Sequence, residues 1–209
     1  MTPCAYGNVD NQPSCQNPDI LDIGDVNPSG HLPVAFPASL SRVPANTAAQ
    51  WPGTNGRVSC SEGLKVGYRW YDANNLTALF PFGFGLSYTG FSFGGLRVGA
   101  VTNGQATVKA TVTNTGSRAG TEVAQLYVAG PGSAGEPPHQ LKGFQRISLA
   151  AGASGTVTFT VPVHAPASWS TTAGHWVAGA GTCQILVGDS SRSLPLSGGL
   201  TLPSEVTAD

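Results

Sequence analysis

The sequence predicts an all-β protein in which an irregular Pro- and Gly-rich extension precedes an antiparallel β-sandwich. From Gly94 onward, apolar and polar residues alternate in short runs, which is the period of half-buried strands. Turn residues interrupt these runs at a spacing of roughly 8 to 12 residues, as is typical of sandwiches. Before Gly94, recurrent Pro residues exclude long helices. We therefore expect an extension over residues 1–90, a sandwich over 91–202 and a tail over 203–209.

One segment of the extension shows strand-like alternation. Leu32, Val34 and Phe36 stand at every second position, which predicts a short strand over 31–36. The remainder is expected to be extended chain lying on another surface. Such a segment alone buries too little apolar area to offset the entropy lost when it becomes ordered.

The strands of the sandwich follow in order. Residues 106–113 alternate Ala and Val with Thr and Lys up to a turn at 114–116, which predicts a half-buried strand. A strand over 123–128 ends before Gly130-Pro131. The same patterning predicts further strands over 141–149, 157–161, 174–178 and 182–187, and a last one near 191–196.

Composition and charge exclude several functional classes. Only 10% of residues are charged and the net charge is −1, so the chain has no basic excess with which to bind DNA or RNA. No apolar run has the length of a membrane span, so no membrane partner is expected. The N-terminus has neither the basic region nor the apolar core of a secretory signal, so no signal peptide is expected in this chain.

The cysteines and histidines do not have the spacing of a metal site, and no metal or cofactor is expected. Cys4 and Cys15 are compatible either with a short disulfide loop in an oxidising compartment or with two free thiols. Cys183 alternates with Ile185 and Val187 on one strand face, which predicts a buried free thiol.

Several segments resemble one known family. The segments GDVNPSGHLPVAFP (24–37), EGLKVGYRWYD (62–72) and FPFGFGLSYTGF (80–91) resemble, in this order, the C-terminal part of glycoside hydrolase family 3 enzymes, chiefly β-glucosidases. Segments 112–128, 141–152 and 176–193 resemble the fibronectin type III-like module that ends many members. The resemblance covers nearly all of the chain after residue 22 and implies that residues 1–90 correspond to the end of the family's α/β sandwich domain and a linker. It also implies an extracellular location as part of a parent enzyme.

The family's motifs are not all intact. Four positions depart from the usual pattern, where the family commonly has Arg, Tyr, His and an acidic residue: His31, Cys60, Phe84 and Ser170. Phe84 removes a polar group from the FPFGFGLSYTGF segment. His31 and Cys60 are expected to alter packing where domains meet.

The resemblance implies no catalytic residue in this chain. A retaining β-glycosidase needs a carboxylate nucleophile and a carboxylic acid/base about 5–5.5 Å apart. In the family, the nucleophilic Asp lies in a Ser-Asp-Trp context on an N-terminal barrel, and the acid/base Glu lies upstream of the segment at 24–37. No Asp precedes a Trp here. We therefore expect the chain alone to be inactive and its partners to be the family's catalytic domains.

Two aromatic groups are candidates for carbohydrate binding. Trp70 and Tyr71 could stack on a sugar while Asp72 and Glu62 accept hydroxyl hydrogen bonds. The alternative is an aromatic packing wedge in which Arg69 pairs with a nearby carboxylate.

The second group is Trp169 and Trp176, which could bind polysaccharide if exposed. If buried, they would fill the core or a domain contact, as large aromatic residues commonly do.

Three functions remain open. The first is a non-catalytic accessory module that stabilises or positions catalytic domains; it predicts that residues 1–90 expose apolar surface through which the chain self-associates. The second is a stand-alone carbohydrate-binding module, which requires an exposed, coplanar row of aromatic rings. The third is a β-glucosidase subunit that acts with a separate catalytic chain.

Overall fold

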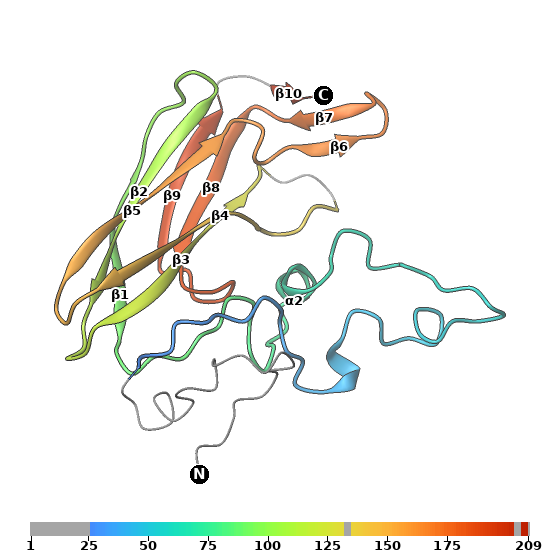
Figure 1. Ribbon diagram of the computed structural model, residues 1–209. Helices are drawn as coiled ribbons and strands as arrows, with labels where there is room; N and C mark the ends of the chain where they lie inside the picture. Colours follow the sequence, from blue (N-terminus) through green and yellow to red (C-terminus); the bar gives the residue numbers. More distant parts are fainter. Residues whose placement is uncertain (1–25, 132–134, 203–205, 209) are drawn as a thin grey trace, which may run out of the picture.

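A computed structural model describes residues 26–131, 135–202 and 206–208 of the protein. Two antiparallel sheets pack face to face (Figure 1). One has the strand order β1-β2-β5, with β1 at Phe91–Val98, β2 at Gln105–Asn114 and β5 at Ser154–Pro162. The other has the order β4-β3-β8-β9, with β4 at Gln140–Leu149, β3 at Gly120–Ala129, β8 at Gly181–Gly188 and β9 at Leu196–Leu202. The predicted antiparallel β-sandwich is confirmed.

A third, small sheet projects from one end of the sandwich (Figure 1). It has the order β10-β7-β6, with β6 at Ser168–Ser170, β7 at His175–Ala178 and β10 at Val206–Ala208. The extension contains only a short 3-10 helix, η2 (Leu40–Arg42), and one short α-helix, α2 (Tyr68–Ala73), within its described residues. No helix in the described part of the chain is long and apolar enough to cross a bilayer.

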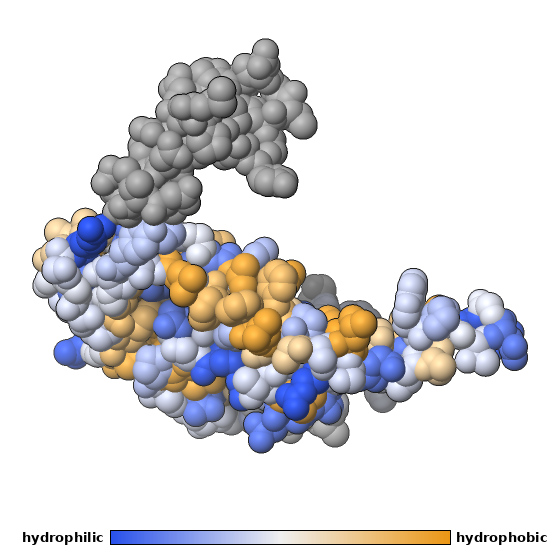
Figure 2. Space-filling model, turned by 90° about the horizontal axis from the view of Figure 1, so that it is seen from below, coloured by the Kyte–Doolittle hydropathy of each residue, from blue (hydrophilic) through white to orange (hydrophobic). Residues whose placement is uncertain are grey.

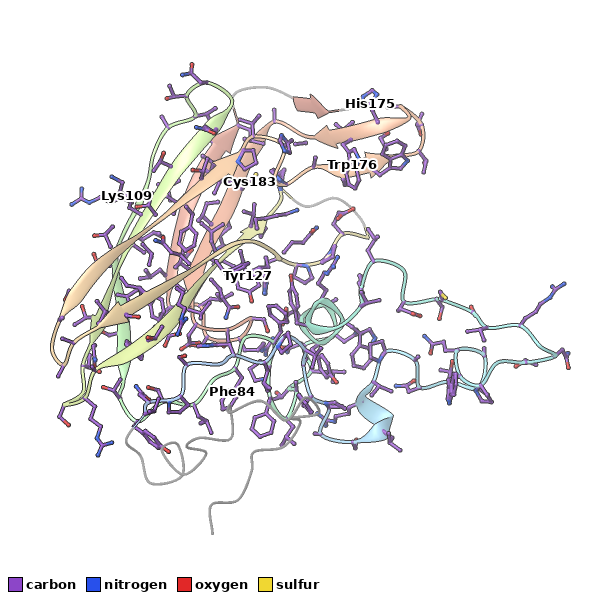
Figure 3. All side chains as sticks on the ribbon, in the orientation of Figure 1. Phe84, Lys109, Tyr127, His175, Trp176 and Cys183 are labelled. Atoms are coloured by element: carbon purple, nitrogen blue, oxygen red, sulfur yellow. The ribbon has the colours of Figure 1, made fainter. Side chains whose placement is uncertain are left out.

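The core forms where the inward faces of the two sheets meet. Val108 and Val112 of β2 are 0% exposed, and they pack in one cluster with Leu126 of β3 and Ile185 of β8. Cys183 belongs to the same cluster and carries a free thiol, as predicted (Figure 3). Burial raises the pKa of this thiol, so it remains protonated and unreactive at neutral pH. Cys4 and Cys15, for which a disulfide and two free thiols were both open, lie outside the described residues.

Two expected strands are wrong. Residues 31–36 form no strand but two isolated bridges, His31 with Gly85 and Phe36 with Phe80, because Pro33 has no N–H to continue the ladder. The last strand begins at Leu196 rather than near 191. Its Gly198-Gly199 pair is unusual in strands, but the absence of a side chain at Gly198 makes room for Leu96 and Val98.

β3 is buried on both faces, whereas a half-buried strand exposes one face to solvent. Leu126 points into the core, yet the next residue, Tyr127, is also 0% exposed. The extension covers Tyr127 from the outer side of the sheet (Figures 1 and 3). We use the name seam for the contact that residues 26–90 make with the outer face of this sheet and with the loops next to that face.

Candidate functional site

The centre of the seam is a cluster of aromatic rings. Tyr68 of α2 lies with its ring centroid 5.1 Å from Phe82, 5.7 Å from Tyr127 and 6.1 Å from His139. The Tyr68 hydroxyl accepts a hydrogen bond from the Leu141 backbone N–H at 2.8 Å. Burial raises the pKa of both Tyr68 and Tyr127, so both phenols remain neutral and serve to pack and hydrogen-bond α2 against the sandwich.

Asp72 ties the end of α2 to two loops of the sandwich. Its side chain is 3% exposed; one oxygen lies 3.1 Å from Arg192 Nη1 and the other 3.2 Å from His139 Nε2. A carboxylate this deeply buried requires cationic partners. Arg192 lies in the loop after β8 and His139 directly before β4. The Arg192 ion pair and the contact with His139 therefore hold the end of α2 against the sandwich.

The Phe80–Phe91 segment contacts β3 through a buried amide. The Gln125 side chain donates hydrogen bonds to the backbone carbonyls of Gly83 and Asp189, and it accepts one from the Tyr127 hydroxyl at 2.7 Å. Gln125 is 3% exposed, and its polar atoms are satisfied entirely within the seam. The Ser191 N–H also donates to the Phe82 carbonyl at 2.9 Å. The segment FPFGFGLSYTGF is thus a structural junction in this chain.

His31 adds a second ionic contact across the seam. Its Nε2 lies 3.0 Å from Glu122 Oε1, and the two side chains are 14% and 10% exposed. The hydrogen bond to Glu122 raises the pKa of His31 above its ordinary value of 6.5, against the opposing effect of burial. The Ser29 carbonyl and the Asp189 carboxylate act in the same direction as Glu122.

Replacing His31 by Gln should therefore make the protein lose a pH-dependent part of its stability. Because the folded-state pKa is raised, the contribution is full below pH 6.5 and is lost as the pH rises through the folded-state pKa. Denaturant unfolding should show a wild-type advantage of roughly 1 kcal/mol at about pH 5.5, shrinking at about pH 9. His164→Gln, an exposed position in the loop before β6, is the control. An advantage that grows with pH would contradict this assignment.

The structure places the first group of predicted carbohydrate-binding residues in or beside the seam. Tyr71 is 4% exposed and donates a hydrogen bond from its hydroxyl to the Arg42 carbonyl at 2.6 Å. Trp70 stands edge-on to Tyr71, with ring centroids 5.2 Å apart. Asp72 contacts Arg192, whereas sequence proximity pointed to Arg69 as an ion-pair partner. Glu62 accepts a hydrogen bond from Gln50 instead of joining Asp72. All four thus have partners within the protein, and their role in sugar binding stays a prediction.

Trp169 and Trp176 lie elsewhere, on the projecting hairpin of β6 and β7 (Figure 3). They are 51% and 45% exposed. The interpretation that they fill the core is therefore wrong, while a domain contact and a carbohydrate contact both remain compatible with their position. Sequence alternation could not separate these cases, because a strand outside the sandwich has the same period as one inside it.

Large apolar side chains are exposed along the extension. Figure 2 views the molecule from the side on which the extension lies, and hydrophobic residues gather near the middle of that face. Phe80 packs against Phe36 and Phe84 with ring centroids 6.3 and 5.0 Å away, yet remains 38% exposed. Segments 34–40 and 79–86 are joined by the Phe36–Phe80 bridge, and we call their exposed large hydrophobic residues the apolar face: Val34, Phe36, Leu40, Leu79, Phe80 and Leu86.

Among the described residues, no group of three or more His, Cys, Asp and Glu side chains is arranged to hold a metal ion. Their buried carboxylates, Asp72 and Glu122, are engaged in the seam. The extension is thus fixed to the sandwich through the seam, and it exposes the apolar face elsewhere on its surface.

Comparison with known proteins is consistent with this architecture. The model of the fibronectin type III-like domain matches residues 122–191. A probable β-glucosidase L of Aspergillus terreus is 39% identical over 203 residues, which is 88% of this chain and 27% of the relative. An exo-α-(1→6)-L-arabinopyranosidase of Bifidobacterium breve is 41% identical, over 85% of this chain and 24% of the relative.

Solved structures show the same likeness to β-glucosidases. A β-glucosidase from Streptomyces venezuelae, determined with D-glucose, has a TM-score of 0.84 at 37% identity, over 90% of this chain and 24% of its own. A family 3 β-glucosidase from Bifidobacterium adolescentis has a TM-score of 0.81 at 40% identity, over 90% of this chain and 28% of its own. The chain spans about a quarter of the length of these relatives. Over most of its length the chain is therefore similar to a C-terminal part of family 3 β-glucosidases, and its residues 122–191 match the fibronectin type III-like domain.

Proposed function

We propose that the chain is a non-catalytic accessory part of a β-glucosidase-type glycoside hydrolase, which stabilises or positions the catalytic domains. The observation that supports this most directly is the apolar face. It lies on an extension that the seam holds in place, so its side chains form a preorganised surface. Large exposed apolar side chains on a fixed surface mark a contact with another protein.

The length of the relatives indicates which protein domains could be that partner. They are about four times as long as the matched chain, and the additional length accommodates the catalytic domains that a family 3 enzyme needs. We therefore propose those domains as the partner, in an extracellular parent enzyme. No sugar specificity transfers, since one relative is named for glucosides and another for arabinopyranosides.

Two assays test the proposal. The purified chain should not turn over an aryl β-glucoside, and turnover by the chain alone would overturn the non-catalytic assignment. A family 3 β-glucosidase truncated to lack the matched quarter should gain thermal stability when the chain is added. If addition produces glucosidase activity from an otherwise silent partner, the chain acts as a subunit with a separate catalytic chain.

Without catalytic domains, the apolar face should cause self-association. We expect the sedimentation coefficient of the full chain to rise with concentration, because buried apolar area favours association at about 25 cal/mol per Å². The double variant Leu79→Ser, Phe80→Ser should sediment as a monomer and should also lose the effect on the truncated enzyme.

Phe144→Ser is the matched control for this experiment. Phe144 is 70% exposed on β4, outside the apolar face. The variant should self-associate like the wild type. If Phe144→Ser abolishes association and the double variant does not, the contact surface lies on the sandwich instead.

A further inference from the structure

Trp169 and Trp176 face each other on an exposed hairpin. They are directly paired in the antiparallel register of β6 and β7. Their ring centroids are 5.8 Å apart and their planes meet at 76°. Neither belongs to the core cluster, and the hairpin projects away from the sandwich beside neither the seam nor the apolar face (Figures 1 and 3). About half of the surface of each Trp residue is exposed.

The angle between the rings decides what kind of ligand fits. Binding to a flat polymer surface requires coplanar aromatic rings, and this pair does not meet that requirement. Two nearly perpendicular rings instead make a corner. One ring can lie flat beneath a pyranose while the other closes one side. The apolar C–H face of a pyranose suits the electron-rich face of an indole ring.

The hairpin that carries the two rings has no charged residue of its own. Between Ile147 and Gly188 the sequence contains no Asp, Glu, Lys or Arg, while Ser168, Ser170, Thr171 and Thr172 add hydroxyl groups to the hairpin. A polyanion would require Lys or Arg. Protein interfaces that use Trp are commonly enriched in Arg as well. An uncharged aromatic corner with hydroxyl neighbours matches a neutral, hydroxyl-rich ligand.

We propose that Trp169 and Trp176 form a binding site for one pyranose unit of a soluble, neutral polysaccharide chain. The site would hold the parent enzyme near its polymeric substrate or product without taking part in the reaction. It shares no residue with the apolar face. The proposed contact of the apolar face with catalytic domains can therefore be disproved while the sugar site is confirmed. The sugar site can likewise be disproved while that contact is confirmed.

The test is calorimetric titration of the full chain with cellohexaose, and with polygalacturonate as an anionic polymer of pyranose units. We expect weak binding of the neutral oligosaccharide and none of the polyanion. Trp169→Ala and Trp176→Ala should each weaken binding about tenfold, the loss of a favourable aromatic contact. Trp176→Tyr retains an aromatic face and should stay within about threefold of the wild type.

Trp51→Ala is the matched control, because Trp51 is 73% exposed but lies in the extension. It should bind cellohexaose like the wild type. Far-UV circular dichroism should show that the two hairpin Ala variants remain folded. Any of three results would overturn the proposal. The wild type does not bind cellohexaose, both hairpin Ala variants bind it as the wild type does, or Trp51→Ala loses as much affinity as they do.

Discussion

Replacing Asp72 by Ala should lower the free energy of unfolding by about 2 kcal/mol. The Asp72 side chain is 3% exposed and is the common partner of Arg192 and His139. Removing it leaves the Arg192 guanidinium and the His139 ring without their common partner, which is more costly than losing the attraction itself. We expect less than the full cost of breaking a buried pair, because the Arg192 side chain is 39% exposed and can turn to solvent.

Urea unfolding at neutral pH measures this effect. Arg192→Gln should cost less than Asp72→Ala, because Asp72 then keeps its contact with His139. The control is Glu136→Gln, where the carboxylate accepts a single hydrogen bond from Gln140 at 3.3 Å; it should change stability by less than about 0.5 kcal/mol. If Asp72→Ala is as mild as Glu136→Gln, the ion pairs do not fasten the extension.

The strands of the sandwich could be predicted because their signal is local. Burial on one face imposes alternation on consecutive residues, and the expected segment over 141–149 corresponds to β4 at Gln140–Leu149. β9 was harder to place because Gly198 and Gly199 carry no side chain to show a period. α2 has six residues, fewer than two helical turns, and so gives no detectable helical periodicity.

The seam could not be predicted, because its partners are distant in sequence. The hydrogen-bonded pair Arg192–Asp72 spans 120 positions, and the pair Leu141–Tyr68 spans 73. From the sequence alone, Asp72 beside Trp70 and Tyr71 was also compatible with sugar binding. One signal did exist. Tyr127 sits at an outward position of β3 and is large and aromatic, which indicates that something covers that face.

Replacing Gly83 by Ala should cost about 3 kcal/mol, the largest effect expected from so small a change. Gly83 has φ +84°, a conformation that L residues with a Cβ adopt only with strain. In addition, the new Cβ would overlap the Gln125 side-chain amide. Gln125 cannot move aside without breaking its hydrogen bonds to the Asp189 carbonyl and the Tyr127 hydroxyl.

Gly104→Ala separates the two causes. Gly104 has φ +76° in the turn before β2, and a Cβ there would meet no atom within 4 Å. It should cost about 1 kcal/mol from backbone strain alone. The additional loss in Gly83→Ala, about 2 kcal/mol, then measures the disruption of the Gln125 contacts. Urea unfolding gives both values, and equal costs would mean that the seam tolerates the extra methyl group. Limited proteolysis should also cleave the Gly83→Ala protein between the extension and the sandwich, because loosening the seam exposes the backbone of residues 80–90. The Gly104→Ala protein should not be cleaved there.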